Sequence, residues 1–186
     1  TTMRTLQFAL VLAAKYVSIQ DKVRTELSQN MENGTKFDLH AVNKCVHFRA
    51  FIYEIFRIST IGKGMPPRTM TQDTWFNVDG NGYCIPKGFT IKARFAHMNK
   101  YALNENWTFK SMEDGLKLDL NNWIIDNKFV MNKSFATFGM GRRDCPGRQL
   151  AEKQIQTIMG YILMNYNLKL QDKDIDTVDK SLSGVS

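Results

Sequence analysis

Hydrophobic residues recur every three or four positions in four stretches of the chain, and this spacing predicts amphipathic helices. No capping residue or initiator methionine precedes the first stretch, so we expect the start of that helix to be missing. Ser18 and Asp21 have the spacing of a capping box and predict the start of the second helix. The last stretch is apolar enough that we expect it to be buried. The predicted helices span residues 1–17, Ser18 to the Asn33–Gly34 turn, about 43–58 and about 148–165.

Between the third and fourth helices the pattern changes to short hydrophobic runs separated by turn signals, which is typical of strands. The turn signals are Asp79-Gly80-Asn81-Gly82 and Pro86-Lys87-Gly88. Residues 98–134 are polar and irregular, and a loop of this length is usually functional or wrapped onto something else. The sequence thus predicts one mostly α domain with a small β region. The predicted strands are 76–78, 83–85 and 90–95.

The composition is that of a soluble globular protein, with 43% hydrophobic and 23% charged residues. No run approaches the roughly 18 consecutive apolar residues that a bilayer requires, so we expect no membrane span in this chain. The net charge of +7 would suit an acidic protein partner. We expect no nucleic-acid partner, because the basic residues are scattered and do not alternate with aromatic residues in a patch.

Three cysteines, Cys45, Cys84 and Cys145, form no Cys-x-x-Cys pair and leave one residue over in any disulfide scheme. Free thiols in a reducing compartment fit this pattern, so each cysteine is either inert core or reactive.

Cys145 lies in the segment Phe138–Gly147, which reads FGMGRRDCPG. Gly139 and Gly141 allow the backbone to turn sharply and to approach a flat, bulky group. The cysteine just precedes a predicted helix, whose N-terminal N–H groups and dipole favour the thiolate. Nearby arginines favour it as well. These are Arg142, Arg143 and Arg148.

The spacing around Cys145 excludes two chemistries. A cysteine-dependent phosphatase needs an arginine several residues after the nucleophile, and Arg148 is too close. A covalently attached c-type haem needs Cys-x-x-Cys-His, which is absent from the sequence. A non-covalently held metal centre with one thiolate ligand remains, beside the ordinary alternative of an idle thiol.

Phe138, Gly141, Arg143, Cys145 and Gly147 resemble, position for position, the haem-binding signature of the cytochrome P450 family, Phe-x-x-Gly-x-Arg-x-Cys-x-Gly. The resemblance implies the C-terminal part of the P450 fold and haem b (iron protoporphyrin IX) as cofactor. Cys145 would be the thiolate ligand to the iron. Arg143 would pair with a propionate, and Phe138 would pack beside the sulfur. The two signature glycines would leave room near the porphyrin.

Glu54 and Arg57, one turn apart on the third predicted helix, resemble the structural Glu-x-x-Arg motif of the same family. In the family an arginine from a later segment completes this pair. Here Leu120-Asn-Asn-Trp123 aligns with that segment, and Asn122 stands where arginine is usual. We therefore expect a weakened network. Arg68 resembles a basic residue that contacts a propionate in the family.

The first residues resemble the end of the long distal helix of P450s, and Thr1 would take the place of the threonine that helps deliver protons to iron-bound oxygen. The resemblance runs from Thr1 to about Leu170, which is less than half of the family's domain. Residues 1–186 are therefore expected to be a partial P450 domain: the distal-helix end, the Glu-x-x-Arg helix, a small sheet, the cysteine loop and the helix after it. The rest would supply most of the substrate pocket and any membrane anchor.

The resemblance implies a haem-thiolate monooxygenase that inserts one oxygen atom of O₂ into an apolar substrate, with electrons from a flavoprotein reductase. The alternative is a truncated, non-catalytic remnant that binds haem weakly or not at all. A full-length member would be anchored in the endoplasmic-reticulum membrane with a cytoplasmic catalytic domain, whereas the sequence assigns no location to the chain itself.

Overall fold

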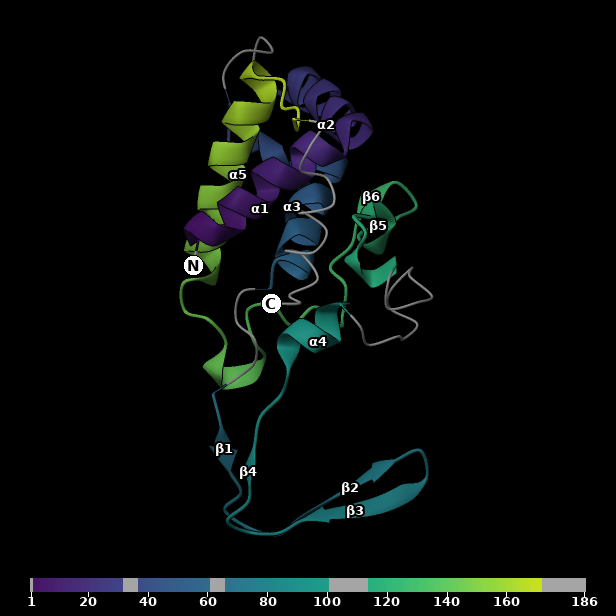
Figure 1. The fold of residues 1–186 in the computed structure, drawn as a ribbon, viewed down its shortest axis with the longest axis vertical. Coiled ribbons are helices and arrows are strands. Elements are labelled where there is room, and N and C mark those ends of the chain that lie inside the picture. The colour runs from purple at the N-terminus through teal and green to yellow at the C-terminus, as the bar shows by residue number, and fades with distance from the viewer. Residues whose placement is uncertain (1, 32–36, 61–65, 101–113, 172–186) are drawn as a thin grey trace.

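The structure is a computed structural model that describes residues 2–31, 37–60, 66–100 and 114–171. The predicted Asn33–Gly34 turn therefore lies outside the described residues, as does Thr1. Figure 1 shows the longer helices gathered into a body at one end of the molecule, with strands extending from the other end. These helices are α1 (Thr2–Lys15), α2 (Val17–Asn30), α3 (Val46–Ile58) and α5 (Arg148–Asn165).

Helix α3 forms the core of the helical body because it is apolar on nearly every side. Every residue from Ala50 to Ile58 is buried, and a helix that is apolar all round belongs in a core. Helices α1, α2 and α5 pack around it, and a short 3-10 helix, η2 (Ala41–Lys44), leads into it. The predicted third helix is thus confirmed and forms the centre of the fold.

Helix α2 begins one residue earlier than predicted, and the capping box at Ser18 is wrong. The residue before the helix is Tyr16, and no side chain caps the N-terminus. Instead, the carbonyl of Tyr16 accepts the N–H groups of Ile19 and Gln20, each at 3.0 Å. The chain passes almost directly from α1 into α2, so backbone groups replace a capping side chain.

Helix α5 has the predicted boundaries but is buried on one face only. Ile155, Met159 and Leu163 are fully buried against the other helices. Leu150 is 62% exposed and Tyr161 is 56% exposed, so the expectation of a buried helix is confirmed for one face and wrong for the other. Apolar content alone does not reveal which side of a helix has neighbours.

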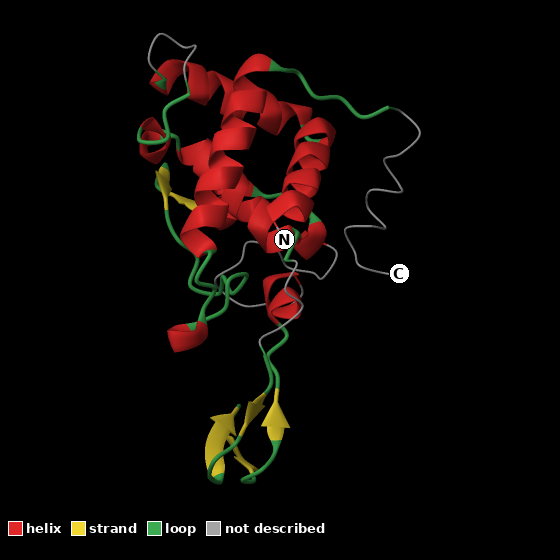
Figure 2. Ribbon diagram, turned by 90° about the vertical axis from the view of Figure 1, so that its left-hand side faces the viewer, coloured by secondary structure: helices red, strands yellow, loops and turns green. Residues whose placement is uncertain are grey.

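The first four strands form two antiparallel ribbons that extend from the helical body (Figure 2), and the described residues contain a third two-stranded sheet further along the chain. β1 (Arg68–Thr69) pairs with β4 (Thr90–Ile91), and β2 (Thr74–Val78) pairs with β3 (Asn81–Ile85). Asp79 (φ 51°) and Gly80 (φ 84°) form the turn of the second ribbon in left-handed conformations, as a two-residue hairpin loop requires. The predicted strands 76–78 and 83–85 are confirmed as this hairpin.

The third predicted strand, 90–95, ends at Ile91, and Phe95 instead begins helix α4 (Phe95–Lys100). The N–H of Met98 donates to the carbonyl of Arg94 at 3.0 Å, which closes the first turn. Phe95 is buried, and its ring lies near Gly139. The short apolar run 90–95 cannot distinguish a strand from the start of a helix, because a single buried side chain such as Phe95 is compatible with both.

The polar stretch after α4 wraps against α3 in its described part, as expected. Trp123 is fully buried there and stacks on Phe129 at 6.3 Å between ring centroids. Residues 101–113, with Trp107, lie outside the described residues. The elements of this stretch are η3 (Asp114–Leu116), η4 (Leu120–Asn122), β5 (Ile124–Ile125) and β6 (Lys128–Phe129).

The described part is mostly helical with small two-stranded sheets, as predicted. Among its helices, none combines the length and the apolar character needed to cross a bilayer.

Candidate functional site

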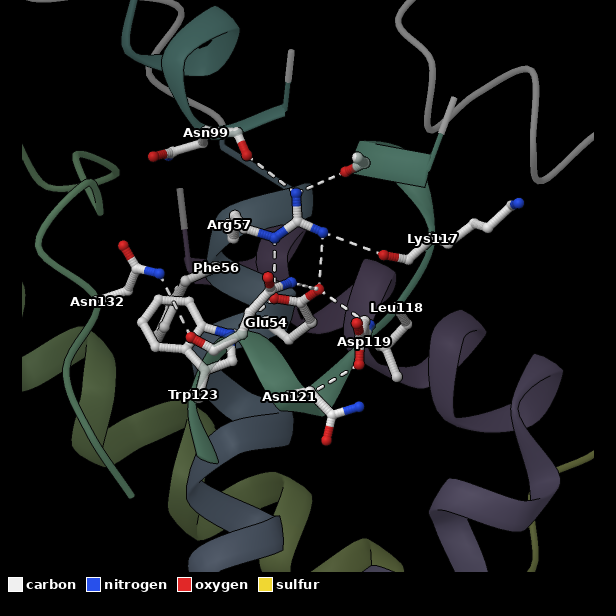
Figure 3. A network of polar contacts seen from close by, with 12 residues as sticks. Glu54, Phe56, Arg57, Asn99, Lys117, Leu118, Asp119, Asn121, Trp123 and Asn132 are labelled. Atoms are coloured by element: carbon white, nitrogen blue, oxygen red, sulfur yellow. Dashed lines mark hydrogen bonds and ion pairs between the residues drawn. The ribbon is translucent and has the colours of Figure 1, made fainter. Parts of the chain in front are cut away.

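Glu54 and Arg57 form a fully buried ion pair one turn apart on α3 (Figure 3). The Arg57 Nη2 donates to Glu54 Oε1 at 2.7 Å, and its Nε donates to Oε2 at 2.8 Å. Both side chains are 0% exposed. Burying two charges is costly unless their remaining hydrogen-bonding positions are also satisfied.

The Glu54 carboxylate accepts three further hydrogen bonds from the segment around η4. The Asn122 amide donates to Oε1 at 3.1 Å, the Trp123 indole to Oε2 at 2.7 Å, and the backbone N–H of Asp119 to Oε1 at 3.0 Å. Asn122 therefore occupies the place where the family has arginine and still donates to Glu54. The difference from an arginine is that the amide brings no positive charge.

The Arg57 guanidinium is satisfied by backbone carbonyls on its other side. Its Nη1 donates to the carbonyls of Asn99 at 2.9 Å and Gly115 at 2.5 Å, and its Nη2 donates to that of Lys117 at 3.0 Å. One buried pair thus joins α3 to the end of α4 and to the chain that wraps around it.

Asn99 carries this connection on to the residues just before the cysteine segment. Its amide nitrogen donates to the hydroxyls of Thr60 at 2.8 Å and Thr137 at 2.7 Å, and its oxygen accepts the N–H of Ala136 at 3.0 Å. The Thr137 hydroxyl also donates to the carbonyl of Phe56 at 2.9 Å. Sequence reasoning missed Asn99 and Thr137, because neither residue belongs to a recognisable motif.

The segment Phe138–Gly147 presents Cys145 on a sharply turned backbone. Gly139 (φ 84°) and Gly141 (φ 73°) both adopt left-handed conformations, which glycine tolerates best. The N–H of Cys145 donates to the carbonyl of Phe138 at 2.7 Å and closes the loop around the 3-10 helix η5 (Gly141–Arg143). The Cys145 side chain is exposed at the start of α5.

The Phe138 ring is held on several sides. Phe56 and Phe135 approach it edge to face, with ring centroids at 5.0 and 6.0 Å. The Arg148 guanidinium carbon lies 5.5 Å from the ring centroid. The position of this aromatic side chain, whose carbonyl also holds Cys145, is therefore defined by α3, α5 and the segment before the loop.

Arg148 is tied to Glu152 and, through it, to Tyr53. The Arg148 Nε donates to Glu152 Oε1 at 2.8 Å, and the Tyr53 hydroxyl donates to the same oxygen at 2.9 Å. Burial and then the Glu152 charge raise the pKa of Tyr53 to about 12. Burial opposes the charge of Arg148, but Glu152 and then Tyr53 outweigh it and hold the pKa of Arg148 above its usual value.

Arg148 has its positive charge matched by Glu152 and is not among the residues that line the cavity beside the cysteine. That its charge favours the Cys145 thiolate stays a prediction. Arg142 and Arg143 do line that cavity.

A cavity of about 720 Å³ lies beside Cys145, within the range of small-molecule and cofactor sites. Its walls come from the first turns of α1, the end of α3, β1, α4, the cysteine segment and the start of α5. Apolar lining residues include Phe56, Phe95, Leu150, Ala151 and Ile155.

The cavity brings together most of the sequence-predicted site residues. Phe138, Arg143, Cys145 and Gly147 line it, and Arg68 reaches it from β1, far away in the sequence. Gly141 does not line it. Glu54 and Arg57, on α3, are fully buried in the core and do not line the cavity. Thr1 lies outside the described residues, whereas Thr2 and Thr5, which sequence reasoning did not select, line the cavity from α1.

The residues present suit a large, flat, apolar group that carries carboxylates and a thiophilic metal. Apolar side chains form the walls, and Arg68, Arg142 and Arg143 offer charged donors. Gly147 lies next to the thiol, since a Cβ built on it would be 3.9 Å from the Cys145 sulfur, an ordinary van der Waals contact.

Of the three cysteines, all of which the structure describes, only Cys145 lines this cavity. Cys84 lies on the β3 strand of the hairpin. Cys45 is fully buried, and burial and then the Glu26 charge raise its pKa to about 11, which favours an inert thiol.

A mostly helical chain that offers one thiol, apolar side chains from several helices and several arginines to a large cavity has the features of a haem-thiolate protein. The model of the family described as "Cytochrome P450" matches residues 1–186. The chain therefore belongs to the cytochrome P450 family, a family of haem monooxygenases.

Individual relatives agree with this assignment. The chain is 30% identical to mouse "Cytochrome P450 2C70" over 181 residues, which cover 95% of this chain and 35% of that protein. It is 31% identical to "Probable cytochrome P450 516A1" of Dictyostelium discoideum over 172 residues, which cover 92% and 33%. The chain thus spans about a third of the length of the curated relatives it matches.

Proposed function

We propose that this chain forms the proximal side of a haem b site in a haem-thiolate monooxygenase, with Cys145 as the axial ligand to the iron. The observation that carries the proposal is the placement of the Cys145 thiol on a 720 Å³ cavity, within a segment that matches the family's haem-binding signature. Residues 1–186 would then be one part of a P450 domain.

The cysteine segment would present sulfur to the iron without distortion of the loop. Gly139 and Gly141 already adopt the left-handed backbone that the turn requires, and the Phe138 carbonyl already holds the Cys145 N–H. The ligand is therefore preorganised, which avoids an ordering cost on binding. When bound, the haem would supply the redox chemistry that activates O₂.

The arginines around the cavity would orient the cofactor through its carboxylates. Arg143 lies two residues before the ligand, and Arg68 lines the cavity from a separate strand. Charge-assisted hydrogen bonds from two directions would fix the rotation of a planar group as well as its depth. Thr2 and Thr5 would contribute hydroxyl groups to the cavity wall from α1.

The apolar walls would exclude water from the sulfur and from the porphyrin faces. Leu150, Ala151 and Ile155 of α5 and Phe56 of α3 supply this surface. A dry environment strengthens electrostatic interactions at the ligand. Leu150 is 62% exposed in the chain alone, and a flat apolar cofactor would cover such a side chain.

The whole protein would act on an apolar organic substrate and receive electrons from a flavoprotein reductase. The net charge of +7 and the exposed Arg142 within the cysteine segment support an acidic electron donor.

The proposal is tested by the spectrum of the reduced, carbon-monoxide-bound haem protein. Wild-type protein and Cys84→Ser should both give the red-shifted Soret band of a thiolate-ligated haem, because Cys84 lies on the hairpin. Cys145→Ser should lose that band. A red-shifted band that survives in Cys145→Ser, or that is lost only in Cys84→Ser, would refute Cys145 as the ligand.

A further inference from the structure

The Arg148 guanidinium lies against the Phe138 ring, with its carbon 5.5 Å from the ring centroid. Phe138 lines the cavity, whereas Arg148 does not, although the two are in contact. Arg148 also directs its Nε to Glu152, one helical turn further along α5. The arginine therefore touches a residue of the candidate site without reaching the site itself.

Tyr53 fixes this arrangement from a different helix. It lies on α3, 99 residues before Glu152 in the sequence, and donates to the same carboxylate oxygen as Arg148. Tyr53 also packs edge to face against Phe56, which in turn packs against Phe138. Two routes, one polar and one aromatic, thus lead from Tyr53 to the Phe138 ring.

Movement of Phe138 would be transmitted to Cys145, because the Phe138 carbonyl accepts the Cys145 N–H at 2.7 Å. The Arg148 N–H donates to the Cys145 carbonyl at 3.2 Å, so the backbone on both sides of the cysteine is bonded to this pair of residues. The Glu152 carboxylate offsets the positive charge of Arg148. The arrangement can therefore position groups around the sulfur while adding little net charge.

We propose that Arg148, held by Glu152 and Tyr53, is a positioning residue that keeps Phe138 in place beside Cys145 and so determines how well the thiolate is retained as a ligand. This inference rests on the proposed function, since it assumes that Cys145 binds the iron. A planar guanidinium is required, because it can lie against a ring and bond a carboxylate at once, which an ammonium group cannot do in the same geometry.

The test compares how fast the red-shifted Soret band of the reduced, carbon-monoxide-bound protein is lost on mild warming. Arg148→Gln and Arg148→Lys should both lose the band several-fold faster than wild type, because both lack the guanidinium plane. Tyr53→Phe keeps the ring and its packing and should accelerate the loss to a smaller extent. Lys153→Gln removes a charge from the exposed side of α5 and should match wild type.

The variants also separate positioning from charge and from folding. If Arg148→Lys retains the band as long as wild type, charge alone suffices and the inference is overturned. Equal rates for Arg148→Gln, Tyr53→Phe and Lys153→Gln would overturn it too. A wild-type protein without the red-shifted band would overturn the proposed function together with this inference, whereas a normal wild-type band with unaffected variants overturns only the inference.

Urea unfolding of each variant before haem is added shows whether a faster loss of the band follows from lower global stability, which would count against a positioning role.

Discussion

The cysteines of this chain lie in different environments, and these environments decide which thiol can act. Cys45 is enclosed at the start of α3, where its sulfur lies 3.7 Å from the Ala41 carbonyl. Cys145 is exposed on the wall of a large apolar cavity. The same side chain is therefore a core residue at one position and a candidate metal ligand at the other.

The raised pKa of Cys45 predicts an alkaline loss of stability. The folded state raises this pKa from 9.0 to about 11, so folding favours the neutral thiol. The stabilisation of the folded state by the neutral thiol is fully present below about pH 9. It is lost as the pH rises through about 11, because the unfolded thiol has already ionised there. Two pKa units correspond to about 2–3 kcal/mol.

Cys45→Ser removes the titrating group but keeps a donor for the Ala41 carbonyl. Urea unfolding is measured from about pH 8 to about pH 11.5, the range over which the thiol titrates. The free energy of unfolding should fall less steeply with pH in this variant than in wild type. If the free energy of unfolding falls equally with pH in both proteins, ionisation of Cys45 does not contribute to the alkaline loss of stability.

The residues of the cysteine signature could be predicted from the sequence because they lie within ten consecutive positions and their spacing reflects local backbone geometry. The left-handed conformations of Gly139 and Gly141 follow from that local pattern. The contacts of Tyr53 with Glu152 and of Asn99 with Thr137 could not be predicted, because the partners are 99 and 38 residues apart. Only the packing of whole elements brings them together.

At the scale of elements, the N-terminus of α3 is capped by a side chain from α2. The Glu26 carboxylate accepts the backbone N–H groups of His47 at 3.1 Å and Phe48 at 2.8 Å. Cys45, the residue before the helix, makes no capping hydrogen bond. A carboxylate at the N-terminus of a helix accepts hydrogen bonds from free N–H groups and interacts favourably with the positive end of the helix dipole.

Glu26→Gln should therefore lower the free energy of unfolding by about 1 kcal/mol, because it removes the charge and one of two acceptor oxygens. Asp21→Asn, on the same helix, is a matched control, since that side chain is 63% exposed and its ion pair with Arg24 is 3.5 Å long. Denaturant titrations of the two variants measure the difference. An equal, near-zero effect for both would contradict a capping role for Glu26.

Helix periodicity predicted α1, α3 and α5 well because each helix contributes apolar side chains at helical spacing to a common core. Element boundaries that depend on a neighbouring element were less predictable. The start of α2 follows from backbone bonds to Tyr16, and the end of the strand before Phe95 follows from burial of that ring near Gly139. Neither signal is contained in a single run of residues.

At the scale of the whole molecule, the Glu54–Arg57 pair joins segments that are far apart in the sequence. It bonds α3, the end of α4 and residues 115–123, and Asn99 extends this network to the chain before Cys145. The candidate site is thus supported from behind by a buried polar network as well as by apolar packing.

Glu54→Gln should destabilise the chain by about 3–5 kcal/mol, because it leaves the Arg57 charge buried without an opposite charge. The new amide nitrogen would also face the donor of Asn122 or that of Trp123, depending on which carboxylate oxygen it replaces. Thermal and urea unfolding measure the loss, with the exposed Asp21→Asn as control. A loss below about 1 kcal/mol, the range of surface ion pairs, would contradict this account of the network.

The central claim is that the Cys145 sulfur binds the haem iron, and X-ray absorption at the iron edge of the haem-loaded protein tests it most directly. Wild-type protein should show one sulfur neighbour in the first coordination shell. Cys84→Ser should show the same sulfur neighbour, and Cys145→Ser should show only nitrogen and oxygen neighbours. A sulfur neighbour that persists in Cys145→Ser, or a wild-type shell without sulfur, would contradict the claim.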